Sequence, residues 1–428
     1  MVKEGYKEVR IGPKTKLIPE EWKVKKLKKA IKKRKGKRPN KLFESQNGEN
    51  FIPYLSVNYL RGNDLPEWCS KDDDNKVEVK ENEILMIWDG SYSGNVFMGF
   101  NGALSSTMAR LKCEDEINNQ YLYYQLRNNF KIFQSTTIGT SVPHVAGKIF
   151  ENLNIPTPRK KEQKKIASIL SSVDKSIEKT DEVIEETKEL KKGLMKELLT
   201  KGIGHSEFKE LKFGPEIISL PLDWKILKLK EITDVRSSNV NKKSKNNERH
   251  IKLCNYTDVY YNEQINENIK FMEATAKDRE IERFTLEKDD VIITKDSETP
   301  DDIGVPAVVT KDLSNILCGY HLALLKPNKK LIDGEFLSKM LQSKNITNQF
   351  YRLAQGLTRF GLRVTSIKNT KIPVPPLKEQ KKIASILSSV DAKIQKEEEY
   401  KAKLEKLKKG LMQKLLTGEI RVNTEMEV

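Results

Sequence analysis

The sequence predicts a mixed α/β (α+β) protein in which two modules alternate with two long helices. Three observations predict this order. The segment KEQKKIASILSSVD occurs at 161–174 and again at 378–391, each copy opens a long run of helical periodicity, and about 150 to 175 residues with short apolar runs precede each copy. A chain of 428 residues is also long enough for several domains. We therefore expect a first module at 1–158, a first helical repeat at 159–204, a second module at 205–375 and a second helical repeat at 376–428.

Each module contains short apolar runs bounded by Gly, Asn, Asp and Pro, a pattern typical of strands. The predicted strands lie at 84–87, 291–293, 305–309 and 322–325. The modules also share weaker patterns: GPKTKLIPEEWK at 12–23 with GPEIISLPLDWK at 214–225, ENEILMIW at 81–88 with EKDDVIIT at 287–294, and INNQYLYYQL at 117–126 with IDGEFLSKML at 332–341. Two related, compact α/β units with strand-rich cores follow.

Each repeat predicts one helix of about 40 residues, roughly 60 Å long at 1.5 Å per residue. Apolar residues recur at steps of three and four from Ile166 to Leu198 and from Ile383 to Leu415, with prolines just upstream and Glu and Gln in the first turn. Such a narrow stripe is typical of a coiled coil. Glu397 and Glu398 interrupt the second stripe, so we expect a local irregularity there. The two similar modules form a pseudo-two-fold arrangement only if the two helices run antiparallel.

The pattern I-P-x-P-x2-K-E-Q-x2-I, present from Ile155 and again from Ile372, resembles the DNA sequence-specificity subunit of Type I restriction-modification enzymes. In the first copy, Arg159-Lys160 replaces the Pro376-Leu377 of the second. The resemblance covers essentially the whole chain. It implies two target-recognition domains, each reading half of a bipartite site in double-stranded DNA, and two helical repeats that pair as an antiparallel coiled coil. It also implies no catalysis and no cofactor bound by this chain. The expected partners are two adenine-methylating subunits that use S-adenosylmethionine and, through them, restriction subunits that use ATP and Mg.

The positive charge is concentrated near the start of the chain. The chain holds 78 Lys and Arg against 61 acids, and residues 1–50 alone hold 17 bases and 6 acids, which favours a polyanionic partner. We interpret the acid-free segment 23–41 as an arm or loop that grips phosphate; a solvated helix face continuing from Leu27 and Ile31, or a flexible loop, is the alternative. The candidate phosphate contacts are Lys32, Lys33, Arg34, Lys35, Lys37 and Arg38.

Two further segments are candidates for DNA contact. KKSKNNER at 242–249 occupies the equivalent place in the second module, where an ordinary surface loop is the alternative, and polar loops at 136–141 and 355–359 precede the two helices. Arg pairs with guanine and Asn with adenine in the major groove, although Asn is common in loops. The candidates are Lys242, Lys243, Lys245, Asn246, Asn247 and Arg249 with Asn239 and Asn241 beside them, and Thr358, Arg359 and Arg363. His144, close to the first polar loop, is interpreted as a structural histidine.

The helical repeats are the candidate docking surface for partner subunits, because their surfaces are nearly duplicated and so fit two copies of one partner. The residues assigned to docking are Glu162, Gln163, Lys164, Glu379, Gln380 and Lys381. Solvated coiled-coil flanks are the alternative interpretation of the charged helix faces.

Enzyme motifs are missing from the sequence. It contains no G-x4-G-K-[ST] loop, no F-x-G-x-G, and no Asn-Pro-Pro-aromatic segment, and the acids near Asp72 only loosely imitate a metal-nuclease set. The four cysteines lie far apart, which indicates buried thiols rather than a metal site, and the absence of a long apolar segment indicates a cytoplasmic protein without a membrane partner. The alternative function is a non-enzymatic coiled-coil scaffold with non-specific nucleic-acid binding.

Overall fold

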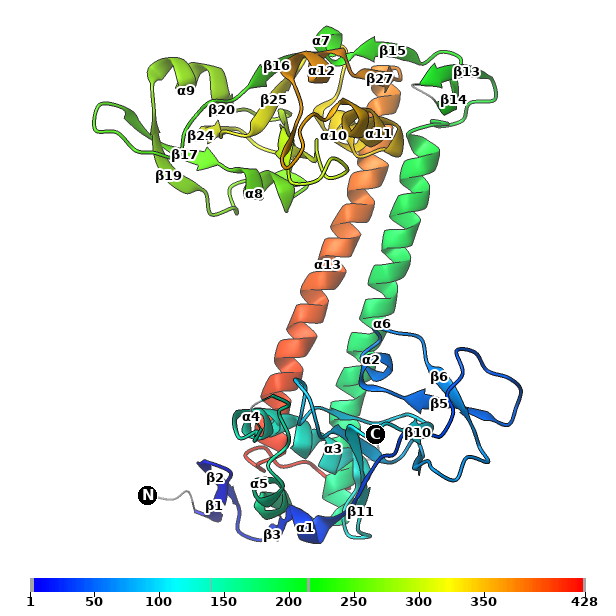
Figure 1. The fold of residues 1–428 in the computed structure, drawn as a ribbon. Helices are drawn as coiled ribbons and strands as arrows, with labels where there is room; N and C mark the ends of the chain where they lie inside the picture. The colour runs from blue at the N-terminus through cyan, green and yellow to red at the C-terminus, as the bar shows by residue number, and fades with distance from the viewer. Residues whose placement is uncertain (1–3, 140, 214–215, 426–428) are drawn as a thin grey trace. The chain divides into compact units, whose positions relative to one another are not determined.

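The computed structural model describes residues 4–139, 141–213 and 216–425. The chain divides into two compact units (Figure 1). Unit 1 comprises Met1–Asp181 and Glu399–Val428, and unit 2 comprises Glu182–Glu398. Each unit thus contains one module together with part of each long helix.

Two four-stranded sheets form the first module, with the strand orders β4-β11-β8-β9 and β6-β5-β10-β7. All four residues of β8 are buried, as in a strand covered on both faces, and β4 lies at the edge of its sheet. The elements are β1 Tyr6–Ile11, β2 Lys14–Pro19, β3 Lys23–Lys26, α1 Leu27–Ala30, β4 Ile31–Lys35, β5 Phe51–Leu55, α2 Val57–Leu60, β6 Glu67–Ser70, β7 Glu78–Val79, β8 Ile84–Ile87, β9 Val96–Phe97, β10 Gly102–Leu104, β11 Met108–Cys113, α3 Asn119–Asn128, α4 Phe130–Ser135, α5 Gly147–Asn152 and β12 Asn154–Thr157.

The second module repeats this pairing pattern. Its sheets have the orders β16-β25-β21-β23-β18 and β19-β17-β24-β20. The antiparallel set β16-β25-β21 corresponds to β4-β11-β8, and the parallel pair β17-β24 corresponds to β5-β10. The elements are β13 Phe208–Phe213, β14 Glu216–Pro221, β15 Lys225–Lys228, α7 Leu229–Ile232, β16 Thr233–Ser237, β17 Arg249–Cys254, α8 Tyr256–Tyr260, β18 Gln264–Ile265, β19 Met272–Ala276, α9 Asp278–Phe284, β20 Thr285–Leu286, β21 Val291–Thr294, β22 Asp296–Ser297, β23 Pro306–Val309, β24 Leu313–Cys318, β25 Leu322–Pro327, α10 Gly334–Leu341, α11 Lys344–Leu353, β26 Phe360–Gly361, α12 Val364–Asn369 and β27 Lys371–Val374.

The predicted strands are present as β8, β21, β23 and β25, but the alignment of 81–88 with 287–294 is wrong by one residue. Ile87 pairs with Met108, the first residue of β11, and Thr294 pairs with Leu322, the first residue of β25. Ile87 therefore corresponds to Thr294 rather than to Ile293. The buried runs are uniformly apolar, so their letters do not fix the register, which is set by strand pairing.

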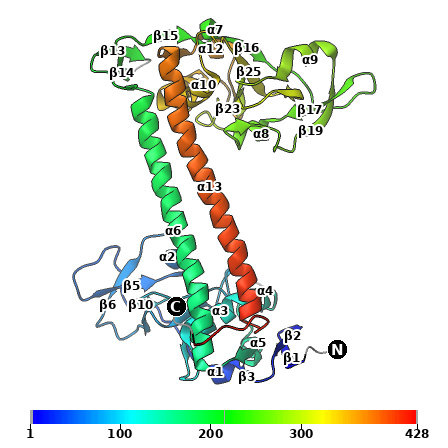
Figure 2. The same cartoon turned by 180° about the vertical axis from the view of Figure 1, so that it is seen from behind.

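The long helices α6 Lys160–Leu198 and α13 Leu377–Leu415 are each continuous over 39 residues. They lie side by side in both views (Figures 1 and 2). In unit 1, Lys401 pairs with Asp181 at 2.6 Å and Lys408 pairs with Asp174. In unit 2, Lys191 pairs with Asp391 at 2.6 Å. Rising numbers on α6 meet falling numbers on α13, so the predicted antiparallel coiled coil is confirmed.

Near Glu397 and Glu398, where an irregularity of the apolar stripe is expected, α13 itself continues without a break. Lys188 of α6 lies 3.5 Å from Glu398, so an ion pair stands where the apolar stripe is interrupted. Three of the four cysteines are buried and Cys113 is partly buried; all four are free thiols. Burial raises the pKa of the Cys113 thiol to about 12, which keeps it protonated. None of the helices in the described part of the chain has the length and apolar character needed to cross a bilayer.

A buried glutamine fastens each module to its long helix. Gln163 of α6 accepts a hydrogen bond from the Asn118 N–H (2.8 Å) and donates to the carbonyl oxygens of Pro158 and Glu116. Gln380 of α13 makes the same set, with the Asp333 N–H (2.9 Å) and the carbonyl oxygens of Pro375 and Leu331. In each case the glutamine holds the N-cap residue of the helix that packs on the coiled coil, α3 or α10.

Candidate nucleic-acid interface

In the first module, a carboxylate, an imidazole and an ammonium group meet beyond the end of β8. Asp89 follows β8 by two residues and forms a backbone bridge with His144. Its carboxylate lies 2.6 Å from His144 Nδ1 and 2.6 Å from Lys35 Nζ, the last residue of β4. His144 is thereby held beside the end of β8, and it also forms a backbone bridge with Ile138.

A polar cavity of about 440 Å³ opens beside this cluster. It is lined by Ser56, Val57, Asn58, Asp64, Glu67, Ile87, Asp89, Gly90, Ser91, Tyr92, Ser105 and Thr107. The Arg61 guanidinium lies 3.5 Å from the centre of the Tyr92 ring. The cavity therefore combines acceptor oxygens, hydroxyl groups and an exposed aromatic ring at the ends of several strands.

The second module has a corresponding cluster beyond β21. Asp296 follows β21 by two residues, as Asp89 follows β8, and it pairs with Gly361 of β26 in the strand pairing β22-β26. The Asp296 carboxylate accepts a hydrogen bond from His321 Nδ1. Beside it, Lys295 Nζ lies 3.1 Å from Ser237 Oγ and 5.9 Å from the centre of the Tyr320 ring.

The two clusters differ in what surrounds the carboxylate. Tyr256 occupies the position in α8 that Val57 occupies in α2, the first helical residue after the corresponding strand. Burial and neighbouring acids raise the pKa of Tyr256, against hydrogen bonds to Ser297 and Thr294 that lower it. The equivalent helices therefore begin with a valine in one module and with a tyrosine in the other.

The segment 23–41, predicted to be a phosphate-gripping arm or loop, consists of β3, α1 and β4 followed by irregular chain. Residues 31–35 form the edge strand β4, paired with β11, and the chain becomes irregular only from Gly36. Successive side chains of a strand point to opposite faces of the sheet, so the neighbouring basic residues of β4 lie on two faces. Composition alone does not reveal this arrangement. The six candidate side chains are all exposed: Lys32, Lys33, Arg34, Lys35, Lys37 and Arg38. Lys32 lies 3.5 Å from Glu114, and Lys33 Nζ lies 3.9 Å from the centre of the Trp88 ring.

The candidates at 242–249 belong to the exposed loop between β16 and β17. Lys242, Lys243, Asn246 and Asn247 lie in this loop, and Asn239 and Asn241 at its start are also exposed. The Lys245 N–H donates to Thr275 Oγ1 at 2.9 Å, and Arg249 begins β17 with its guanidinium 3.1 Å from Asp278. The loop leaves the sheet at Ser237, the partner of Lys295, so it starts beside the Asp296 cluster.

The two polar loops before the helices also reach these clusters. Thr358 and Arg359 are exposed in the hairpin closed by Gln355 and Gly361, and Arg363 is the exposed N-cap residue of α12. In the first module the corresponding loop ends at His144, while Thr140 lies outside the described residues. In the first module the end of β4 and the loop that ends at His144 therefore meet at Asp89. In the second module the end of β16 lies beside Lys295, and the 355–361 hairpin pairs with Asp296.

The assigned docking residues fall into two groups. Glu162, Gln163 and Gln380 are buried and Glu379 is mostly buried, and each is hydrogen-bonded within its own unit. Lys164 and Lys381 are exposed. Docking stays a prediction for all six, and the two lysines are the members that face solvent.

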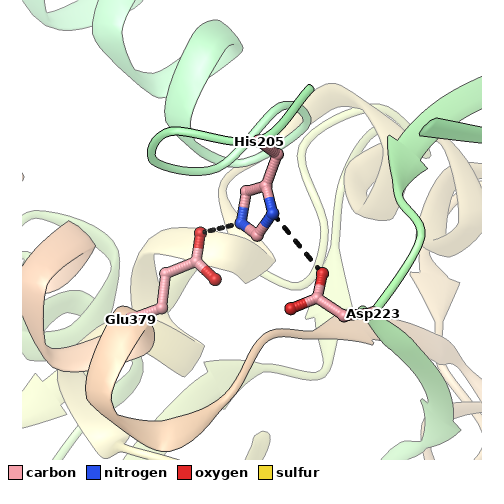
Figure 3. A group of neighbouring side chains, drawn as sticks. All are labelled: His205, Asp223 and Glu379. Carbon is pink, nitrogen blue, oxygen red and sulfur yellow. Dashed lines mark hydrogen bonds and ion pairs between the residues drawn. The ribbon is translucent and has the colours of Figure 1, made fainter. Parts of the chain in front are cut away.

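The buried glutamates form equivalent ion pairs in the two units. In unit 1, the guanidinium of Arg421, beyond α13, donates to both oxygens of Glu162 at 2.8 and 3.2 Å and to Glu21 at 2.7 Å. In unit 2, His205, beyond α6, lies between Glu379 (2.9 Å from Nε2) and Asp223 (3.5 Å from Nδ1), as Figure 3 shows. The hydrogen bonds with Glu162 and Glu21 raise the pKa of the Arg421 guanidinium.

His205, Asp223 and Glu379 also have the composition of a metal site. The two carboxylates, however, face opposite nitrogens of the ring, whereas a metal ion would need both on the side of one nitrogen (Figure 3). Glu379 further accepts hydrogen bonds from the Ile203 N–H (2.9 Å) and Trp224 Nε1 (3.2 Å). Because the equivalent place in unit 1 holds an arginine, we interpret the cluster as an ion pair that closes the module.

Sequence reasoning missed Asp89, Asp296 and His321 and interpreted His144 as structural. A signal was present, since an aspartate follows the central buried strand by the same two residues in both modules. The histidines carried no such signal, because they come from different loops of the two modules.

Comparisons with known proteins agree on one family. A family model described as the Type I restriction modification DNA specificity domain matches twice, at residues 19–189 and 221–406. The chain is 34% identical to the Type I restriction enzyme MjaVIII specificity subunit of Methanocaldococcus jannaschii over 412 residues, covering 95% of this chain and 94% of that protein. It is 28% identical to the putative type I restriction enzyme MjaX specificity subunit of the same organism, over 73% of this chain and 70% of that protein.

Solved structures show the same fold. The S subunit of a Type-I restriction-modification system from M. genitalium superposes with a TM-score of 0.59 at 19% identity, covering 92% of this chain and 96% of that one. A chain from a study of type I R-M complex assembly and conformational transition gives 0.55 at 16% identity, covering 94% and 99%.

Proposed function

The chain belongs to the family of Type I restriction-modification DNA specificity subunits, and from this premise we propose that each module reads one half of an asymmetric, bipartite site in double-stranded DNA. The observation that supports this most is that a lysine and a polar loop lie beside the equivalent aspartate in both modules, Lys35 beside Asp89 and Lys295 beside Asp296. Phosphate contacts orient a protein on DNA, and side chains at base edges supply the sequence preference.

The contacts divide between these roles. The lysines and arginines of β4 and of the β16–β17 loop are assigned to phosphate, and the asparagines of that loop and the 355–361 hairpin to base edges. The functional domains are proposed at 1–158 and 205–375, with helical repeats at 159–204 and 376–428. Because the modules share their strand order but differ around their clusters, the half-sites should differ in sequence.

The chain itself is proposed to be non-catalytic and to bind no cofactor. The methylation subunits, two per chain, would supply S-adenosylmethionine chemistry, and the restriction subunits would join through them with ATP and Mg. The docking surface is proposed on the helical repeats, with Lys164 and Lys381 as the exposed residues of the duplicated segment. A scaffold with only non-specific nucleic-acid binding is not favoured, because the family match covers both modules.

An exchange of one module tests the proposal. Residues 205–371 are replaced by the corresponding residues of another specificity subunit, and the chimera is assembled with its methylation subunits. Sequencing of DNA selected from a random duplex library, or of the methylated adenines, should show one altered half-site and one unchanged half-site. Alteration of both halves, or the absence of any sequence preference in the parent complex, would contradict the proposal.

A further inference from the structure

An imidazole held by a carboxylate lies at the same place in both modules, although the two histidines do not correspond in sequence. His144 comes from the loop before α5, and His321 from the turn between β24 and β25. The chain has only four histidines, and two of them make this contact with the aspartate that follows the central strand. The same arrangement is therefore built twice from different loops.

The carboxylate fixes how each ring presents its second nitrogen. Nδ1 of each histidine faces the aspartate, so Nε2 points to the opposite side of the ring. The His144 side chain is 44% exposed and that of His321 is 27% exposed. Nε2 donates a hydrogen bond when it is protonated and accepts one when it is not, and either form matches a group on a base edge.

The surroundings match nucleic acid rather than a small polar substrate. Each cluster has a lysine beside it, Lys35 or Lys295, and an exposed tyrosine, Tyr92 or Tyr320. Ammonium groups neutralise phosphate, and tyrosine rings stack on bases or fill the groove. Tyr320 lies against the His321 ring, with the ring centres 3.8 Å apart.

A hydrolytic dyad is the chemical alternative to a binding role. It requires a nucleophilic hydroxyl or thiol hydrogen-bonded to the ring nitrogen that faces away from the carboxylate. Within the described part of the chain, each of the two rings makes one side-chain hydrogen bond, and that bond goes from Nδ1 to the aspartate rather than from Nε2 to a nucleophile. The geometry therefore favours recognition over catalysis.

We propose that His144 and His321 each read one base pair of their own half-site through Nε2, and that Asp89 and Asp296 are the residues that position them. This assignment rests on the proposed function, and it names two side chains that would give each module its preference for a DNA sequence. Because the surrounding side chains differ, the two histidines are expected to read positions in two different half-site sequences.

The test selects DNA from a random duplex library with the full chain assembled with its methylation subunits. The variants are His144→Ala, at an exposed side chain, and His321→Asn, because the backbone of His321 has φ 71° and asparagine tolerates this left-handed region. His250→Asn, at an exposed histidine of β17, is the matched control. Asp89→Asn and Asp296→Asn keep an acceptor at Nδ1 and remove the charge.

The expected result is a roughly tenfold loss of discrimination at one position of one half-site for His144→Ala and at one position of the other for His321→Asn. The two Asp→Asn variants should weaken the same positions less, and His250→Asn should leave both half-sites unchanged. Unchanged base preferences in both histidine variants, or a uniform loss of affinity for every sequence, would overturn the assignment of the histidines but not the proposed function. A parent complex without any sequence preference would overturn the proposed function and the assignment with it.

Discussion

At the scale of single residues, unit 2 contains a closed network of two lysines and two acids. Lys191 Nζ lies 2.7 Å from Glu263 and 2.6 Å from Asp391, and Lys339 Nζ lies 2.6 and 2.5 Å from the same two carboxylates. The network joins α6, α13 and α10 to the segment before β18. The Lys339 side chain is only 5% exposed, so the two carboxylates compensate for the water that it has lost.

Removing that buried cation should destabilise unit 2. We expect Lys339→Met to lower the free energy of unfolding by about 2 to 4 kcal/mol, because two close carboxylates lose one of their two cations while Glu263 keeps some solvent. Urea titration followed by hydrogen exchange across unit 2 measures this. Lys344→Met, at an exposed lysine of α11, should change stability little. Equal effects of the two substitutions would contradict the role of the network.

The network also predicts a dependence on pH. Burial alone would raise the pKa of Glu263, but Lys339 and Lys191 outweigh it and lower the pKa from 4.5 to about 2. A lowered carboxyl pKa contributes stability that is complete above pH 4.5 and is lost as pH falls toward 2. The stability difference between the wild type and Glu263→Gln should therefore shrink between about pH 4.5 and pH 2. A difference that stays constant over this range would rule out the ionised carboxylate as its source.

Residues that contact one another across the fold were the part least accessible from sequence. The aspartates follow strands whose position the apolar runs predict, but the histidines that meet them lie 55 and 25 residues away. Likewise the pairs of Arg421 with Glu162 and of His205 with Glu379 join residues 259 and 174 positions apart. These groups come together only when the chain folds, so composition and spacing do not reveal the contacts.

At the scale of elements, the helices were predicted well because their periodicity extends over 39 residues and is repeated. The edge strand β4 was not predicted, because four of its five residues are charged and its side chains are exposed on both faces. Edge strands rich in lysine are a common device against pairing with other chains. The same lysines therefore suit two roles, protection of the sheet edge and contact with phosphate.

The antiparallel register of α6 and α13 predicts that matched insertions change the spacer between half-sites. Asp181 of α6 pairs with Lys401 of α13. Seven residues inserted after Asp181 and seven inserted after Tyr400 therefore lie opposite each other, and the ion pairs on either side of the insertion keep their partners. A heptad restores the apolar face and adds about 10.5 Å, and we expect the preferred spacer to lengthen by up to about three base pairs. Selection from DNA libraries of varied spacer measures this.

Insertion of the heptad into α6 alone is the control. It puts the pairs of Asp181 and Asp174 out of register with the Lys191–Asp391 pair, so it should impair assembly rather than lengthen the spacer. A matched double insertion that leaves the spacer unchanged would show that the helices do not set the distance.

At the scale of the whole molecule, unit 1 depends on the last part of α13. Leu415 and Leu416 are buried in one cluster with Ile18, Trp22 and Tyr121, and the Leu416 carbonyl accepts a hydrogen bond from Gln125. The Tyr6 hydroxyl also donates to the Gly418 carbonyl at 3.0 Å. Segments from both ends of the chain thus complete one core.

A charge introduced into that core should unfold unit 1 and spare unit 2. Leu416 is 1% exposed, and we expect Leu416→Asp to cost at least about 3 kcal/mol in unit 1, since it loses apolar burial and buries an unpaired carboxylate. Hydrogen exchange should accelerate over residues 6–135 and stay slow over 216–374. Leu407→Asp, at a position of α13 that is 51% exposed, is the control. Equal acceleration in both units would indicate a single cooperative core instead.

This division also sets an order for folding during synthesis. Unit 2 is one uninterrupted stretch, Glu182–Glu398, and every residue of it has been made before the ribosome reaches Glu399. Unit 1 also contains residues after Glu398, so its cluster around Trp22 and Tyr121 is completed only when Leu415 and Leu416 leave the exit tunnel. At about 5 to 20 residues per second, Trp22 and Tyr121 wait on the order of ten seconds or more for these two partners. Unit 2 is therefore free to fold completely before unit 1, in which the cluster between Ile11 and Ile155 can form early but the cluster around Trp22 cannot be completed.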